Sequence, residues 1–125
     1  MANLSFPDQI FKSLLFAPGN KGAILSKLPR SSPDASIIDL EDSVPTDEKE
    51  NAREITRAII PELNEEAKKM GLFVRVNAFE TAHFTEDLSN AISDVLSGII
   101  VPKISPKEEP DQISNSLSDF GFGNL

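Results

Sequence analysis

Charged and amide side chains stand at the ends of three apolar runs, where they could act on one ligand together. The first group is acidic, and the later groups supply a guanidinium, an amide and an ammonium: Asp39, Glu41 and Asp42, then Arg75 and Asn77, then Lys103. In parallel α/β folds the working residues sit at the carboxyl ends of strands. These strand ends would form one rim of the sheet, along which acidic and basic groups alternate. Such an arrangement would suit an anionic carbonyl substrate, held through its carboxylate beside a divalent cation.

Asp39 and Arg75 each allow two interpretations. Asp39 falls inside an apolar run. Because burying a carboxylate without a partner costs several kcal/mol, Asp39 either pairs with a neighbouring cation or belongs to a site. Arg75 lies between Val74 and Val76 and is expected to point away from both. Its guanidinium group either forms an ion pair with Asp39 or donates two parallel hydrogen bonds to a ligand carboxylate or phosphate. Lys103 is also compatible with an ordinary solvated strand end.

Four short apolar runs predict the strands that position these groups. They cover residues 13–17, 36–40, 72–76 and 98–104, and amphipathic stretches separate them. The run 36–40 shows no strict alternation, as expected of a strand buried on both faces. Strands that alternate with helices indicate βαβ units and a parallel sheet. We therefore predict an α/β fold.

The amphipathic stretches predict four helices, of which the first is short. Thr46 is the expected N-cap of the second helix. Pro61 should end or kink that helix, although a helical segment could resume after it. The third helix is expected over 84–95, with Thr85 as a possible cap, and a fourth over 106–117.

Length and composition bound the class of function. With 125 residues, 39% of them apolar and 26% charged, the chain has an ordinary globular composition and room for one domain, residues 1–125. A net charge of −8 argues against nucleic acid and anionic membrane as partners. The absence of cysteine and the single histidine, His83, exclude thiolate zinc and multi-histidine metal sites, and His83 is expected to be a bystander on a loop. No apolar run approaches the roughly 18 residues of a membrane span, and the opening segment has no signal or transit pattern, so a cytoplasmic location is expected.

Four motifs, in this order, resemble the citrate lyase beta-subunit-like family within the HpcH/HpaI aldolase group. KSLLFAPGN matches the opening strand and turn of that family, IIDLEDSVP its acidic second strand, FVRVNAFET its arginine strand and GIIVPKI its fourth strand. The resemblance covers about residues 12–105. IDLEDSVP together with VRVN is fairly specific, whereas Lys12 stands where the family usually has Arg.

The resemblance implies a (β/α)8 barrel with magnesium-dependent carbon–carbon lyase or related activity. The substrates would be acyl-CoA thioesters of the citryl, malyl or citramalyl type, or the related oxo acids. By this analogy Asp39, Glu41 and Asp42 would lie in or just behind the catalytic site. Arg75 would bind the substrate carboxylate, and the candidate substrate-binding residues are Phe16, Lys27, Arg75, Asn77 and Lys103, with Lys27 for the CoA phosphates. The magnesium-binding Glu and Asp of the family come from the fifth and sixth strands, so no residue here is assigned to the metal.

A barrel of this kind needs about 250 residues, whereas this chain supplies about four β/α units. Four strands of a barrel leave two unpaired edges and an uncovered inner face. We therefore expect the N-terminal half of a barrel, inactive alone and completed in a homo-oligomer or by a complementing half. One alternative is a small open α/β binding or regulatory module with the acidic loop as a cation site. Another is one subunit of a split barrel.

Overall fold

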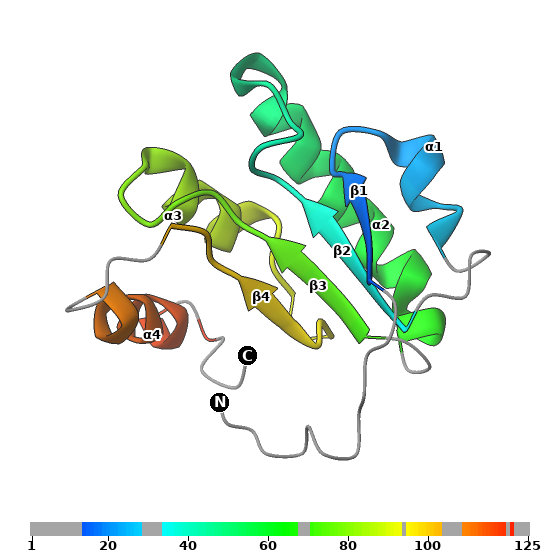
Figure 1. Ribbon diagram of the computed structural model, residues 1–125. Coiled ribbons are helices and arrows are strands. Elements are labelled where there is room, and N and C mark those ends of the chain that lie inside the picture. Colours follow the sequence, from blue (N-terminus) through cyan, green and yellow to red (C-terminus); the bar gives the residue numbers. More distant parts are fainter. Residues whose placement is uncertain are drawn as a thin grey trace.

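Four strands alternate with helices in the computed structural model, which describes residues 14–28, 34–67, 71–93, 95–103, 109–119 and 121. The strands are β1 (Leu14–Pro18), β2 (Ala35–Asp39), β3 (Gly71–Arg75) and β4 (Gly98–Ile100). The helices are α1 (Gly22–Leu25), the 3-10 helix η3 (Thr46–Glu48), α2 (Lys49–Ala67), α3 (Ala82–Asn90) and α4 (Glu109–Asp119). Figure 1 shows this alternation, which confirms the predicted α/β fold.

The four strands form one parallel sheet in the order β1-β2-β3-β4. Its register pairs Pro18 with Asp39 and Asp39 with Arg75. Paired positions in a parallel sheet present their side chains on the same face. The register therefore places Asp39 and Arg75 side by side where β2 and β3 end. All five residues of β2 are buried, as predicted for a strand inside such a sheet.

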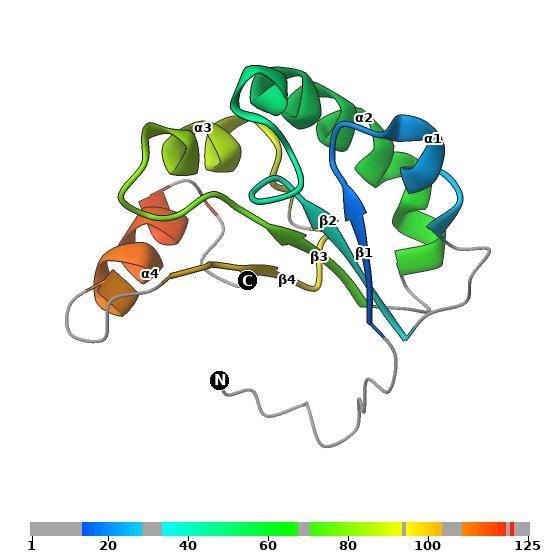
Figure 2. The same ribbon diagram turned by 45° about the horizontal axis from the view of Figure 1, so that its top comes forward.

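Helices cover one face of the sheet. In Figures 1 and 2, α1, α2 and α3 lie over that face and α4 lies beside β4. The buried core between helices and strands includes Ala17, Ile38, Ile60, Leu72, Val74 and Leu88. Among the described residues no helix covers the opposite face, where the side chain of Leu14 is 59% exposed and that of Phe16 is 49% exposed. The open face is the one that carries the Asp39–Arg75 pair.

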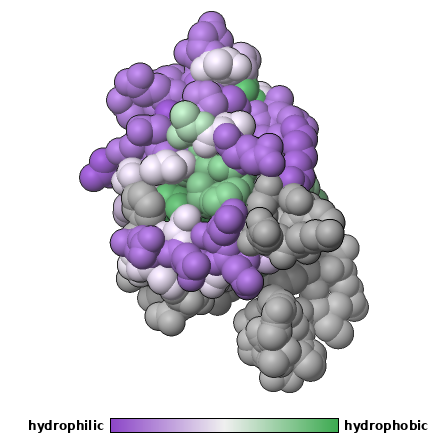
Figure 3. Space-filling model, turned by 90° about the vertical axis from the view of Figure 1, so that its left-hand side faces the viewer, coloured by the Kyte–Doolittle hydropathy of each residue, from purple (hydrophilic) through white to green (hydrophobic). Residues whose placement is uncertain are grey.

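Strand β4 forms one edge of the sheet. Figure 3 views the molecule from the side on which β4, α3 and α4 lie, and shows an apolar surface between hydrophilic side chains. Ile99 and Val101 pack against the core and remain partly exposed at this edge. β4 is shorter than the predicted run 98–104, of which residue 104 lies outside the described residues.

Helix α2 continues through Pro61, so of the two predicted outcomes, an end or a kink, the structure excludes the end. An interior proline costs about 3 kcal/mol, because it lacks an N–H and its ring crowds the preceding turn. Pro61 itself is exposed, whereas Ile60 is 1% exposed and Leu63 is 3% exposed, on the two sides of it. Burying two such side chains contributes roughly as much as the proline costs, so the helix persists.

Both predicted threonine caps were misplaced. Thr46 is the first residue of η3 and makes no side-chain cap, because Pro45 occupies the N-cap position. Thr85 lies inside α3, which begins three residues earlier, after Thr81. The Thr81 hydroxyl donates to the carbonyl of Ala78, 2.8 Å away, and caps no amide of the helix. Helix α3 ends at Asn90, short of the predicted 95. The described helices include none that is long and apolar enough to cross a membrane.

Candidate functional site

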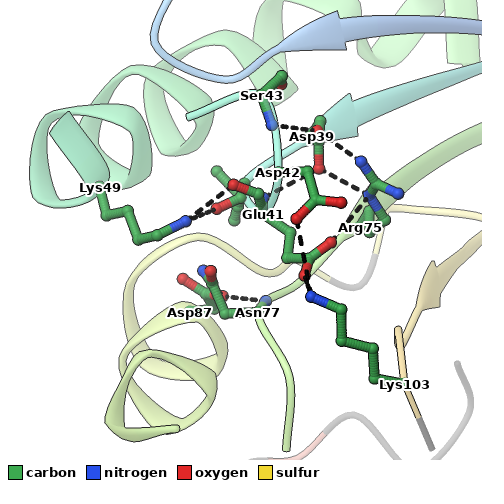
Figure 4. Close-up of polar contacts among 10 residues, drawn as sticks. Asp39, Glu41, Asp42, Ser43, Lys49, Arg75, Asn77, Asp87 and Lys103 are labelled. Atoms are coloured by element: carbon green, nitrogen blue, oxygen red, sulfur yellow. Dashed lines mark hydrogen bonds and ion pairs between the residues drawn. The ribbon is translucent and has the colours of Figure 1, made fainter. Parts of the chain in front are cut away.

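Asp39 and Arg75 form a two-point ion pair at the carboxyl ends of β2 and β3. Arg75 Nε donates to Asp39 Oδ1 and Arg75 Nη2 donates to Asp39 Oδ2, each over 2.8 Å (Figure 4). The Asp39 side chain is 2% exposed, whereas the Arg75 side chain is 24% exposed. This geometry fixes the plane of the guanidinium and leaves its other edge for a second partner. The pairing with Asp39 raises the pKa of Arg75 further.

The loop after β2 wraps around the Asp39 carboxylate. The amide of Glu41 donates to Oδ1 over 2.9 Å and the amide of Ser43 donates to Oδ2 over 3.0 Å. Burial alone would raise the pKa of Asp39. The hydrogen bonds from Arg75, Glu41 and Ser43 outweigh burial and hold that pKa well below its usual range. Asp39 is therefore a stable anion that orients Arg75.

Gly19 brings the turn after β1 against the same strand end. Its amide donates to the carbonyl of Asp39 over 2.7 Å. A Cβ at this position would lie 2.7 Å from Leu40 Cδ2 and 3.0 Å from both the Asp39 carbonyl and Thr56 Oγ1. The close approach therefore favours glycine, because any side chain here would force Leu40, Thr56 or the Asp39 carbonyl to shift.

Glu41, Asp42 and Lys103 form a second charged group beside the pair. Lys103 Nζ lies 2.7 Å from Glu41 Oε2 and 3.7 Å from Asp42 Oδ1, and the hydrogen bond with Glu41 raises the pKa of Lys103. Lys103 has φ 56°, in the left-handed region. Glu41 Oε1 is buried, has no hydrogen-bond partner in the part of the chain that the structure describes, and lies 3.8 Å from Arg75 Nε. Glu41 is thus held between two cations.

A hollow of about 370 Å³ opens beside Arg75. It is lined by Phe16, Ala17, Pro18, Asp39, Ser43 and Arg75. The Arg75 guanidinium carbon lies 5.3 Å from the centre of the Phe16 ring, within the range of a cation–π contact. The hollow combines one oriented cation with an apolar wall, which suits a small carboxylate with a carbon skeleton.

Asn77 faces a different partner. Its main-chain amide and its side-chain Nδ2 both donate to Asp87 Oδ2, each over 2.7 Å. Asp87 is fully buried, and its other oxygen accepts from Arg53 Nε over 2.8 Å. Arg53 Nη2 lies 2.7 Å from His83 Nδ1, and because a guanidinium can only donate, Nδ1 is the acceptor. His83, expected on a loop, lies in α3.

Lys49, at the start of α2, contacts the main chain of the acidic loop. Its Nζ donates to the carbonyls of Leu40 and Glu41, each over 2.9 Å (Figure 4). Lys49 is 9% exposed. Burial lowers the pKa of Lys49, and the nearby carboxylates of Asp87, Asp39 and Glu41 oppose this shift.

The structure thus brings together Phe16, Asp39, Glu41, Asp42, Arg75 and Lys103 from the predicted residues. Lys27 is exposed in the turn after α1, where its amide donates to the carbonyl of Ile24, and no contact among the described residues joins it to this group. Sequence reasoning missed Lys49, Arg53 and Asp87. The spacing of four between Lys49 and Arg53, on the helix face that also buries Ala52 and Thr56, was a signal for the first two.

Magnesium is the cofactor that the resemblance implies, and the described residues do not fit it by themselves. No group of three or more carboxylate or histidine side chains converges among them. Both Asp39 oxygens bind Arg75 and loop amides, and Glu41 Oε2 binds Lys103. Carboxylates already engaged with cations are poor ligands for a hard cation.

Four parallel β/α units with a charged rim at the carboxyl ends of their strands define an α/β protein of the kind that forms (β/α)8 barrels. A model of the HpcH/HpaI aldolase/citrate lyase family matches residues 12–120. The chain belongs to this family.

Relatives and a solved structure agree with that assignment. A citrate lyase subunit beta-like protein of Deinococcus radiodurans is 40% identical over 93% of this chain and 41% of its own length. A (3S)-malyl-CoA thioesterase of Cereibacter sphaeroides is 31% identical over 95% of this chain and 40% of its own length. The M. tuberculosis citrate lyase beta subunit, solved with oxaloacetate and magnesium, matches with a TM-score of 0.55 at 26% identity, over 73% of this chain and 38% of that one. The chain therefore spans less than half the length of these proteins.

Proposed function

We propose that this chain supplies the substrate-carboxylate site of a magnesium-dependent carbon–carbon lyase acting on acyl-CoA thioesters of the citryl, malyl or citramalyl type. Membership of the family and similarity to a citrate lyase beta-like protein support the reaction class. The observation that carries the proposal is the Arg75 guanidinium, fixed by Asp39 on one edge and directed with Phe16 into a hollow.

Arg75 would hold the carboxylate of the substrate while the carbon–carbon bond breaks. Because Asp39 already fixes the plane of the Arg75 guanidinium, this group can bind a carboxylate without losing further side-chain freedom. More of the binding energy is then available for orienting the reacting carbon. The Phe16 ring, which the guanidinium approaches, would exclude water from one side of the substrate. Asp39 acts as the positioning anion in this scheme and does not exchange protons near neutral pH, because its pKa is held low.

The remaining residues have narrower proposed roles. Glu41 and Asp42 would border the reacting part of the substrate, with Lys103 neutralising both. Lys27 would contact the CoA phosphates. Asn77 would shape the rim through its bonds to Asp87.

Magnesium would polarise the substrate carbonyl when bound, with ligands from the part of the family fold that this chain does not span. We propose that residues 1–125 form one partial-barrel domain that is inactive alone. Magnesium-dependent cleavage of malyl-, citramalyl- or citryl-CoA by the pure 125-residue chain would contradict this.

Titration of the chain with oxaloacetate tests the carboxylate site directly. Arg75→Lys should weaken binding at least about tenfold, because a point charge replaces an oriented two-point donor. Arg57→Lys, an exposed arginine on α2, is the matched control and should leave binding unchanged. Equal affinity of wild type and Arg75→Lys, or no binding by wild type, would overturn the proposed role of Arg75.

A thioesterase is a second candidate, because a relative is a (3S)-malyl-CoA thioesterase. Hydrolysis of the thioester releases a free CoA thiol, whereas carbon–carbon cleavage leaves the thioester intact. A thiol reagent separates the two reactions in the active assembly. This chain contains no cysteine and gives no background.

A further inference from the structure

Two buried cations stand four residues apart on α2, and each is linked to the end of a different strand, Lys49 directly and Arg53 through Asp87. Lys49 contacts the main chain directly after β2, through the carbonyls of Leu40 and Glu41. Arg53 contacts Asp87, which holds the amides of Asn77 after β3. One helix face therefore holds both strand ends that meet in the Asp39–Arg75 pair.

Burying the ammonium group of Lys49 beside the acidic loop costs free energy of desolvation. Moving an ammonium out of water costs several kcal/mol unless hydrogen bonds replace the lost hydration. Lys49 Nζ donates to two main-chain carbonyls, and among the described residues the carboxylates of Asp87, Asp39 and Glu41 act on it only from a distance, without a direct ion pair. An aliphatic side chain would occupy the same volume without that cost, so what the ammonium adds is a fixed position for two consecutive carbonyls.

Those carbonyls belong to the loop whose amides donate hydrogen bonds to the Asp39 carboxylate. The Leu40 carbonyl is part of the same peptide unit as the Glu41 amide, which donates to Asp39 Oδ1. The Glu41 carbonyl, which also accepts from Lys49, accepts a bond from the amide of Val44 over 3.2 Å. The loop is therefore bonded on both sides: its carbonyls accept from Lys49, and its amides donate to the Asp39 carboxylate.

We propose that Lys49 is a positioning residue: by fixing the peptide units after β2 from the helix side, it holds Asp39 and through it the Arg75 guanidinium in their paired geometry. This proposal rests on the proposed function in one respect only, which is that the substrate carboxylate binds to Arg75.

Lys49→Met tests this role, because methionine keeps an unbranched side chain and removes the charge and the donors. The readout is hydrogen exchange by NMR at the Arg75 Nε–H and at the amides of Glu41 and Ser43, which all bond to Asp39. In Lys49→Met these three sites should exchange at least about tenfold faster than in wild type, beyond any change in global stability. Lys49→Arg retains donors and should restore part of the protection.

Ile60→Val is the matched control for global destabilisation, because Ile60 lies on the same helix and is 1% exposed. It should raise exchange at these sites no more than its loss of global stability requires. Two results would overturn the proposal. One is the same exchange pattern in Lys49→Met and Ile60→Val after correction for stability. The other is a wild-type Arg75 Nε–H that exchanges as freely as that of the exposed Arg57.

Oxaloacetate titration of the same samples separates this inference from the proposed function. If Lys49 and Arg75 both act as proposed, Lys49→Met should bind oxaloacetate about tenfold more weakly than wild type. If wild type binds none while the exchange pattern appears as expected, the carboxylate-binding role of Arg75 fails and the positioning role of Lys49 stands.

Discussion

Two arginine–aspartate pairs among the described residues have the same N–O distance and different surroundings. Arg75 and Asp39 meet at 2.8 Å at the ends of adjacent strands, and Arg53 and Asp87 meet at 2.8 Å between α2 and α3. The side chain of Arg75 is 24% exposed beside a hollow, whereas that of Arg53 is 8% exposed and reaches His83 with a further nitrogen. The distance therefore does not separate a binding group from a structural one. What separates them is whether the arginine has an edge left that a ligand can reach.

The acidic partners differ in the same way. Asp87 is completely buried and divides its oxygens between Arg53 and the two amides of Asn77. Asp39 receives Arg75 and two amides of its own loop. The first arrangement ties two helices to a strand end, and the second orients one side chain toward an open face.

Asp87→Asn should have the largest effect on stability. Removing one member of a buried pair leaves the charge of Arg53 uncompensated, at a cost of roughly 3 to 5 kcal/mol in the free energy of unfolding. Urea denaturation followed by far-UV circular dichroism measures this, since the chain has no Trp or Tyr. Glu86→Gln, the exposed neighbour on α3, should stay near wild type. A small effect of Asp87→Asn would remove the distinction between the two pairs.

Asp39→Asn should cost less at neutral pH, about 1 to 3 kcal/mol, because Arg75 remains partly hydrated. The pKa of Asp39 is depressed in the folded state, so its contribution is complete above its unfolded pKa of about 4 and is lost as the pH falls toward the folded value. The difference between wild type and Asp39→Asn should therefore be constant from neutral pH to about pH 5 and shrink below about pH 4. Unfolding measured across that pH range tests this.

Asp42→Asn is the control for the acid dependence, because its side chain is 67% exposed on the same loop. It should leave the pH dependence nearly unchanged. An acid-stability profile of Asp39→Asn that runs parallel to wild type below pH 4 would show that the Asp39 pKa is not depressed.

Lys103→Met should have the smallest effect. Its side chain is 66% exposed, and surface ion pairs contribute little because water and salt screen them. We expect an unchanged urea midpoint at moderate salt. A clear loss of stability would place Lys103 with the structural pair and would contradict its position at the rim of the site.

The sequence alone predicted the parallel α/β arrangement and the segments that meet at one rim, because strand ends in such a sheet converge. It left open whether Asp39 pairs with Arg75 or with a ligand, and the register now shows that Asp39 is paired, while Arg75 keeps a reachable edge. Asp87 was missed because its pair with Arg53 joins residues 34 positions apart. Lys49 was missed because its contacts are with main-chain carbonyls, which a pattern of side chains does not reveal. Pro61 does not end α2, because burial of Ile60 and Leu63 outweighs its local propensity.

Gly19 has a consequence for reading substitution data on this protein. Any side chain there would enter the space of Leu40 and Thr56 and press on the carbonyl of Asp39. In a saturation scan, position 19 should tolerate almost no replacement and should appear as sensitive as a ligand-contacting position. Yet it offers a ligand no side-chain group. Intolerance to substitution at this strand end would then reflect the close contact of two backbone segments. A selection for activity alone would not distinguish such a contact from a role in ligand binding or catalysis.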